Sequence, residues 1–274
     1  MKTLRSIAIS LFLGYIALCV LMAIYQRDLL YKPDKKQFSP KAYGLPMDEV
    51  RFKASDGTSL AAWYAPARGK QQVVFVFFFG NGGHLGMRRT DMLGVMEQGY
   101  GVLALNYRGY GKSEGNPTEE GLYDDAHTAI TWLKAKGTAE KNMMIYGESL
   151  GSGIAIEMAT YFDFKGIILE SPYTSIIEAG AYHYPYVPVS LLLKDRYDSI
   201  AKVSQVDEPV LIVHGTDDRI VPFAQGKALH SAFVTSRRTT PHTPTEMEIL
   251  EGYGHNNHDM EWSIDRWSAF EKNI

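Results

Sequence analysis

The sequence predicts an α/β fold, in which a mostly parallel β-sheet carries helices on both faces. Short apolar runs that are typical of buried strands alternate along the chain with helical stretches. Several of these runs are apolar throughout, as expected for parallel strands covered on both faces. Polar residues and glycine-rich loops follow the ends of the runs, where such sheets bind their ligands.

Composition limits what kind of protein this is. The chain has 274 residues, of which 45% are hydrophobic and 22% charged, as in an ordinary globular domain. Lys and Arg number 28 against 31 for Asp and Glu, so the formal net charge is −3. Because there is no basic excess, we expect no nucleic-acid partner. Cys19 is the only cysteine, which excludes a disulfide framework and a cysteine-based metal site.

The amino-terminal segment is expected to be a membrane anchor. From Ile7 to Tyr25 the chain carries no charge, and as a helix this run would span about 28 Å, close to the thickness of a bilayer core. We assign residues 1–28 to a single transmembrane helix and 29–48 to a linker. A cleaved signal peptide is the alternative, but the run is long for one and no A-x-A site follows it. Basic residues on both sides leave the orientation in the membrane open.

The remaining domain, over 49–274, begins with two short strands. They fall within 49–67, around the Asp56-Gly57 dipeptide that is typical of a hairpin turn. The next elements are a buried strand over 71–80, a helix ending near 98, a buried strand over 100–107 and a helix over 118–136. The last of these has an acidic start and a basic end, which suits the helix dipole.

The second half of the domain repeats the alternation of strands and helices. We expect strands over 142–147, 166–170, 209–215 and 245–250, with helices over 151–160, 224–233 and 262–270. The residues at about 176–207 are expected to form a short lid, rich in Tyr, Val and Leu and interrupted by Pro185 and Pro188. Such a lid could line a pocket for an acyl chain, or could simply pack on the body.

Ser149 lies in a G-x-S-x-G pattern over 147–151, where a buried strand is expected to meet a helix. A sharp turn with small neighbours would expose the hydroxyl of this serine as a nucleophile, although an ordinary glycine-rich loop has the same composition. A serine nucleophile needs a base and an acid that orients the base. Asp217 and Asp218 follow one later strand and His255 follows the next, but spacing alone does not separate the two acids.

The chain resembles the α/β-hydrolases, and within them a membrane-anchored, short-lid branch of serine aminopeptidase-like proteins. The resemblance runs from about Leu29 to the end and is carried by FFFGNGG, NYRGYGKSEGNPTEEGLYDDA, YGESLGSG, LESPYTS, HGTDDRIVP and GYGHNN. It implies Ser149 as nucleophile, Asp218 as acid and His255 as base. The family pattern H-G-x-x-D-x-x-V-P selects Asp218 and leaves Asp217 as a solvated turn residue. His258 is expected to be a loop residue rather than a base or a metal ligand.

The resemblance also implies an oxyanion hole made by the backbone N–H groups of Asn81 and Leu150. Phe79 departs from the family, which has histidine at this place in an H-G-N-A-G motif. A backbone donor does not depend on that side chain, so we expect activity, although a hydrogen bond that shapes the loop could be missing. Arg108 and Tyr110 are implied to shape loops near the site rather than to bind substrate.

The resulting hypothesis is a membrane-anchored serine hydrolase that cleaves carboxylic esters, either lipid-like or acyl esters and thioesters, through an acyl-enzyme. The alternatives are a peptidase or protein depalmitoylase of the same fold, and a membrane scaffold without catalysis. A scaffold would be expected to have lost a triad residue, and this chain retains all three. The expected partners are a small-molecule acyl substrate and the membrane, with no cofactor and no metal.

Overall fold

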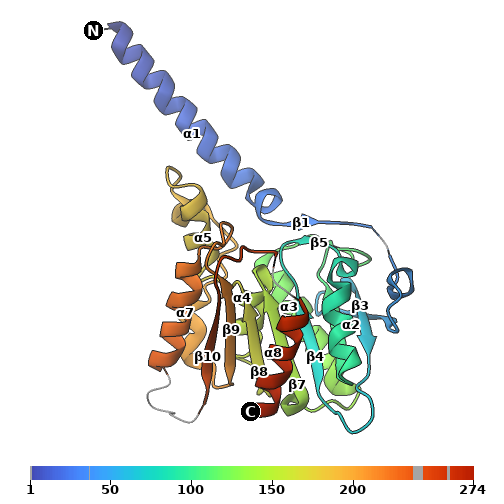
Figure 1. The fold of residues 1–274 in the computed structure, drawn as a ribbon. Helices are drawn as coiled ribbons and strands as arrows, with labels where there is room; N and C mark the ends of the chain where they lie inside the picture. Colours follow the sequence, from blue (N-terminus) through green and yellow to red (C-terminus); the bar gives the residue numbers. More distant parts are fainter. Residues whose placement is uncertain (1, 37, 237–242, 258–259) are drawn as a thin grey trace.

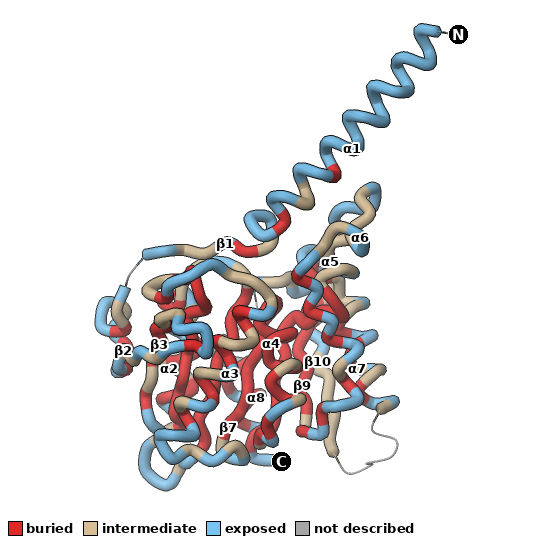
Figure 2. The backbone as a smooth tube through the Cα atoms, turned by 180° about the vertical axis from the view of Figure 1, so that it is seen from behind, coloured by how far each residue is buried: buried red, intermediate tan, exposed pale blue. Residues whose placement is uncertain are grey.

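A computed structural model describes residues 2–36, 38–236, 243–257 and 260–274 (Figure 1). The chain begins with a long helix, α1 (Lys2–Leu30), which projects from the body and contacts it through its carboxyl-terminal half. Most of α1 is exposed (Figure 2), and its mean hydropathy reaches 2.6. By length and composition, α1 could cross a membrane.

The body is built on an eight-stranded sheet in the order β10-β9-β8-β7-β4-β6-β3-β2. Only the β2–β3 and β3–β6 pairs are antiparallel, which confirms the predicted mostly parallel sheet. The strands are β2 (Asp48–Lys53), β3 (Ser59–Ala65), β4 (Val74–Phe78), β6 (Gly101–Asn106), β7 (Met143–Glu148), β8 (Gly166–Glu170), β9 (Val210–Gly215) and β10 (Thr245–Leu250).

Helices cover both faces of this sheet, as predicted. In Figure 1, α2 (Arg89–Glu97) and α8 (Met260–Asn273) lie in front of it, and they share one apolar core with the sheet. The helices α3 (Glu119–Ala135), α4 (Leu150–Met158) and α7 (Phe223–Ser236) contribute to a second core, on the opposite face.

Strand β4 explains why the central runs are apolar throughout. Successive side chains of a strand point to opposite faces of the sheet. Val74, Val76 and Phe78 accordingly enter the core beneath α3 and α4, while Phe75 and Phe77 enter the core beneath α2 and α8. Because both faces are covered, every residue of β4 is buried, and no polar alternation appears in its sequence.

The segment expected to be a linker packs against the body. Strand β1 (Lys32–Pro33) pairs in parallel with β5 (Gly82–Gly83), and a short 3-10 helix (Pro40–Tyr43) follows. Tyr31, Leu45 and Met47 are buried. Short 3-10 turns also occur at Leu85–Arg88 and Glu140–Asn142. The chain therefore passes from α1 into the folded body with little free length.

The lid contains two short helices, α5 (Ile176–His183) and α6 (Val189–Leu192), and a 3-10 helix (Ile200–Gln205) follows. Ser175 caps α5 by accepting a hydrogen bond from the Glu178 N–H at 3.1 Å. Pro185 and Pro188 lie between α5 and α6. Figure 2 shows α5 and α6 beside the carboxyl end of α1, above the carboxyl ends of the parallel strands.

Candidate active site

Ser149 occupies a strained turn between β7 and α4. Its φ of 49° and ψ of −117° are unusual for a residue with a side chain. The turn is tight because strand and helix approach closely: a Cβ added to Gly151 would lie 1.9 Å from the carbonyl oxygen of Phe78. The Ser149 N–H donates to the Glu170 carbonyl at 2.9 Å, which ties the turn to β8. The strained turn places the Ser149 hydroxyl at the carboxyl edge of the sheet.

Three loops bring together the residues that the sequence selected. His255 Nε2 lies 3.0 Å from Ser149 Oγ, and His255 Nδ1 lies 2.7 Å from Asp218 Oδ2. A neutral imidazole with its proton on Nδ1 satisfies both contacts, because Nδ1–H donates to the carboxylate and Nε2 accepts from the hydroxyl. Ser149 follows β7, Asp218 follows β9 and His255 follows β10, so the parallel sheet aligns them at one edge.

Asp218 is held in place by more than His255. Its Oδ1 accepts hydrogen bonds from the N–H groups of Ile220 at 2.8 Å and Val221 at 2.9 Å. Burial alone would raise the pKa of Asp218, but hydrogen bonds from His214 and His255 outweigh it and lower the pKa below its usual range. The carboxylate is therefore ionised at neutral pH and fixed in orientation.

His214 also contacts Asp218, and the sequence indicated no role for this histidine. Its Nε2 lies 3.3 Å from Asp218 Oδ2 and 3.0 Å from the carbonyl oxygen of Val221. A proton on Nε2 suits both acceptors, so His214 supports Asp218 from beneath the site. The only signal in the sequence was its place at the start of the H-G-x-x-D pattern.

Asp217 does not take part in this arrangement. Asp217 is exposed, and its backbone N–H donates to the carbonyl of Tyr253 at 2.9 Å. The carboxylate that contacts His255 belongs to its neighbour, Asp218. His258 lies outside the described residues.

Asn81 and Leu150 both line the cavity that contains Ser149. Leu150 is the first residue of α4, where a helix leaves its N–H groups without internal acceptors. The backbone carbonyl and the side-chain amide of Asn81 form hydrogen bonds that fix the residue in place. Its carbonyl accepts from the Lys32 N–H at 2.9 Å and the Tyr110 hydroxyl at 2.7 Å, and its amide donates to the Leu30 carbonyl at 2.7 Å. Within the described residues, neither backbone N–H donates to a protein group.

Phe79 is buried and stacks on Phe77 with ring centroids 5.4 Å apart. Its carbonyl accepts a hydrogen bond from the Tyr107 hydroxyl at 2.8 Å. The hydroxyls of Tyr107 and Tyr110 therefore fix the loop over 79–81 by donating hydrogen bonds to two of its backbone carbonyls. This is a means of shaping the loop that needs no histidine at position 79. The sequence indicated a loop-shaping role for Tyr110 but none for Tyr107.

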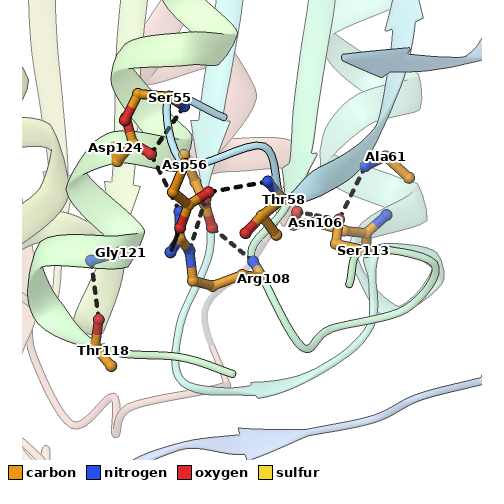
Figure 3. A network of polar contacts seen from close by, with 11 residues as sticks. Ser55, Asp56, Thr58, Ala61, Asn106, Arg108, Ser113, Thr118, Gly121 and Asp124 are labelled. Atoms are coloured by element: carbon orange, nitrogen blue, oxygen red, sulfur yellow. Dashed lines mark hydrogen bonds and ion pairs between the residues drawn. The ribbon is translucent and has the colours of Figure 1, made fainter. Parts of the chain in front are cut away.

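Arg108 organises a separate network beside the site (Figure 3). Its guanidinium contacts Asp56 at 2.9 Å, Asp124 at 3.2 Å and Asp125 at 2.8 Å. Burial raises the pKa of Asp125 to about 6, although the hydrogen bonds from Arg108 act in the opposite direction. Arg108 joins the β2–β3 turn to α3 and does not line the cavity above Ser149.

A cavity of about 270 Å³ opens above Ser149. Its walls come from α1, α5, α6 and the loops after β4 and β9, and most of the lining is apolar. The lining residues are Met22, Gln26, Leu29, Leu30, Asn81, Ser149, Leu150, Tyr173, Ile176, Ala179, Gly180, His183, Tyr184, Val187, Val189, Leu192, Leu193, Ile220 and Val221. None of these described lining residues is an acid, a lysine or an arginine.

Known proteins with similar sequences match most of this chain. Residues 69–196 match the family model described as serine aminopeptidase, S33. An uncharacterized protein of Mycobacterium tuberculosis is 32% identical over 95% of this chain and 92% of its own length. Alpha/beta hydrolase domain-containing protein 17B of Homo sapiens is 30% identical over 76% of this chain and 69% of its own. Lysophosphatidylserine lipase ABHD12 of Danio rerio is 33% identical over 66% of this chain and 53% of its own length.

Solved structures show the same fold. An esterase of Pyrococcus furiosus superposes with a TM-score of 0.72 at 18% identity, covering 89% of this chain and 97% of that one. An alpha-beta hydrolase of Vibrio vulnificus gives a TM-score of 0.68 at 21% identity, with 86% of each chain covered. With these likenesses in fold and sequence, the chain belongs to the α/β-hydrolase family and is a hydrolase.

Proposed function

We propose that this protein is a membrane-anchored serine hydrolase that cleaves carboxylic esters of apolar acyl groups. The observation that carries the proposal is the hydrogen-bonded series from Ser149 through His255 to Asp218, at 3.0 Å and 2.7 Å, at the base of an apolar cavity. The order of these residues along the chain is that of an α/β-hydrolase triad.

Acylation follows from this arrangement. Ser149 Oγ attacks the carbonyl carbon of the ester while His255 Nε2 takes its proton, and the ionised Asp218 stabilises the imidazolium. The N–H groups of Asn81 and Leu150 stabilise the negative charge that develops on the carbonyl oxygen. His255 then donates its proton to the leaving oxygen, the alcohol departs, and the acyl group stays on Ser149.

Deacylation uses the same groups in the reverse sense. A water molecule gives a proton to His255 Nε2 and attacks the acyl carbon, and the oxyanion again lies between Asn81 and Leu150. When the intermediate collapses, His255 returns the proton to Ser149 Oγ and a carboxylic acid is released. The cycle as proposed requires no cofactor.

The cavity favours an acyl ester over a peptide. An aminopeptidase recognises a charged amino terminus, which calls for an acidic side chain in the binding site, and the described lining contains none. The apolar walls instead suit a hydrocarbon chain. The relative from Danio rerio, named a lysophosphatidylserine lipase, supports a lipid-like ester. A thioester on a protein, as in depalmitoylation, remains the second candidate because its acyl half would suit the same walls.

The proposed partners are therefore a small-molecule acyl substrate and the lipid bilayer. The length and apolar composition of α1 support a single-pass anchor. The contacts of α1 with the cavity support its retention in the mature protein, because cleavage of a signal peptide would remove part of the wall.

The test is covalent labelling of the purified full-length protein by a fluorophosphonate probe. We expect wild type to label and Ser149→Ala not to label. Asp218→Ala should lower the labelling rate by about 10⁴-fold, because the imidazole loses its orientation and its counter-charge. The matched variant Asp217→Ala removes an exposed carboxylate one residue away and should label like wild type. Folded wild-type protein that fails to label would exclude catalysis by this triad and favour the scaffold alternative.

A further inference from the structure

We propose that the carboxyl-terminal turns of α1, over residues 22–30, form a specificity-determining wall of the acyl-binding cavity. In this view the membrane helix is part of the substrate site as well as an anchor. The inference rests on the proposed ester hydrolysis and adds to it the structural element that selects the acyl chain.

The first support is the spacing of the lining residues. Met22, Gln26, Leu29 and Leu30 line the cavity, and steps of three or four residues place side chains on one face of a helix. Ile24, on the other face, is 65% exposed. One stripe of α1 therefore faces the substrate cavity, while the remainder is free to contact lipid.

The second support is a direct connection between α1 and the lid. Gln26 is buried and donates from Nε2 to the Leu192 carbonyl at 3.2 Å, while its Oε1 accepts from the Lys194 N–H at 2.6 Å. Arg27 forms a two-pronged ion pair with Asp195 at 2.8 Å and 3.0 Å. These bonds fix the lid against α1, so that the two elements enclose the cavity as a unit.

The third support is a bond from the end of α1 to the candidate oxyanion loop. The Leu30 carbonyl accepts the hydrogen bond of the Asn81 side-chain amide at 2.7 Å. Leu30 therefore contacts both the cavity and the residue proposed to bind the oxyanion. A change in the position of α1 would alter the acyl wall and the reacting end of the site together.

These contacts define the class of substrate that the wall would select. The lid reaches well along α1, since the Tyr15 hydroxyl donates to the Tyr186 carbonyl at 2.9 Å. Tyr186 and Leu191 are 87% and 81% exposed, so the lid presents apolar side chains beside an apolar helix. An acyl chain leaving the bilayer along α1 would pass from lipid into the cavity without crossing water. We therefore assign long-chain esters that reside in the membrane as the preferred substrates.

The experiment compares chain-length selectivity in full-length variants reconstituted in phosphatidylcholine vesicles. Met22→Trp adds bulk to the wall, and Ile24→Trp adds the same bulk to the lipid-facing side as a matched control. The readout is the ratio of kcat/KM for a p-nitrophenyl ester of a long chain to that for a short chain. We expect Met22→Trp to lower this ratio at least about tenfold, because a few methylenes would lose their binding surface. Ile24→Trp should keep the wild-type ratio.

A second variant, Leu29→Trp, tests the next turn of the same face and should also lower the ratio. Fluorophosphonate labelling of each variant establishes that the triad is assembled before the ratio is interpreted. Equal ratios in wild type, Met22→Trp and Leu29→Trp would overturn the wall while leaving ester hydrolysis standing. A wild type that neither labels nor hydrolyses either ester would overturn the proposed function itself, so the two failures are distinguishable.

Discussion

Ser149, Asp218 and His255 lie on the loops that follow β7, β9 and β10, whereas the cavity above them is enclosed by α1 and the lid. Ser149 and Asp218 are 9% and 6% exposed, and backbone hydrogen bonds fix the turns that carry them. The lid side chains Tyr186 and Leu191 are largely exposed. The comparison teaches that the proposed reacting groups depend on the packed sheet, while the proposed acyl wall depends on a few contacts between peripheral elements.

The largest effect should come from crowding the strand-to-helix turn of the packed region. In Gly151→Ala, the new methyl group would meet the Phe78 carbonyl oxygen at 1.9 Å, a backbone atom that cannot move aside. We expect a loss of about 3 kcal/mol or more in the free energy of unfolding, measured by thermal unfolding in detergent. Gly14→Ala in α1, where a methyl group meets nothing within 4 Å, is the control. A stable, fully labelled Gly151→Ala protein would contradict the dependence of Ser149 on the packed sheet.

The next largest effect is expected at Tyr110, which lies where the packed sheet meets the cavity. Tyr110→Phe removes the hydroxyl that donates to the Asn81 carbonyl, so the candidate oxyanion N–H would be less well aligned. We expect kcat to fall about fivefold with little change in KM, since one hydrogen bond is worth about 1 kcal/mol and the oxyanion forms after binding. Tyr100→Phe, which loses a buried hydrogen bond to Glu271, is the matched control for stability. An equal kcat in both variants would make the role of Tyr110 purely structural.

A smaller effect is expected when the lid loses one charged contact. Asp195→Asn weakens the pairing with Arg27 and with the Tyr31 hydroxyl, yet keeps a similar side-chain volume. We expect about threefold faster proteolysis within the lid and unchanged melting of the body, because the sheet does not depend on this contact. Asp163→Asn, which breaks an exposed pair with Lys141, is the control. A parallel loss of body stability would show that lid and sheet unfold as one unit.

A further effect, confined to stability, is expected at the opposite end of the sheet. Glu208 lies next to β9, accepts from the Phe164 N–H at 3.1 Å, and has its pKa raised by burial from 4.5 to about 7. The folded state therefore holds this proton more tightly than the unfolded state. The stabilising contribution is complete below pH 4.5 and is lost as the pH rises through about 7.

Glu208→Gln should flatten this dependence. We expect its free energy of unfolding at about pH 8 to exceed that of wild type by about 2 kcal/mol, and this difference to shrink at about pH 5. Chemical unfolding at both pH values measures this, with Glu97→Gln at an exposed site as the control. The same pH profile in wild type and Glu208→Gln would assign the dependence to another group. Ester hydrolysis should be unaffected, because Glu208 is remote from the cavity.

The sequence predicted the sheet well because its central strands are buried on both faces and their apolar runs are continuous. It also selected Ser149 and His255, since each follows a strand whose end must lie at the same edge. Spacing could not separate Asp217 from Asp218. In the structure the choice depends on the hydrogen bonds from the Ile220 and Val221 N–H groups, which turn one carboxylate inward.

Other features of the structure could not be predicted from sequence patterns. Strands β1 and β5 have two residues each and form only through tertiary contact, so no periodicity in the sequence predicts them. The face of α1 that meets the lid could not be predicted, because the run over 7–25 is apolar on every side of the helix and shows no amphipathic pattern. Gln26, a polar residue just past the uncharged run, was the one available signal for this face, and its buried amide now explains it.

The direct passage from α1 into β1 has a kinetic consequence. The Tyr31 N–H still donates to the Arg27 carbonyl at 2.8 Å, and Lys32 already pairs with Gly82. If α1 is the membrane anchor proposed here, a cavity tethered this closely to it stays at one height relative to the bilayer and meets a membrane-resident substrate by diffusion in two dimensions. Turnover would then follow the mole fraction of substrate among the lipids. Adding inert lipid at a constant amount of enzyme and substrate would slow the reaction, although their bulk concentrations stay the same.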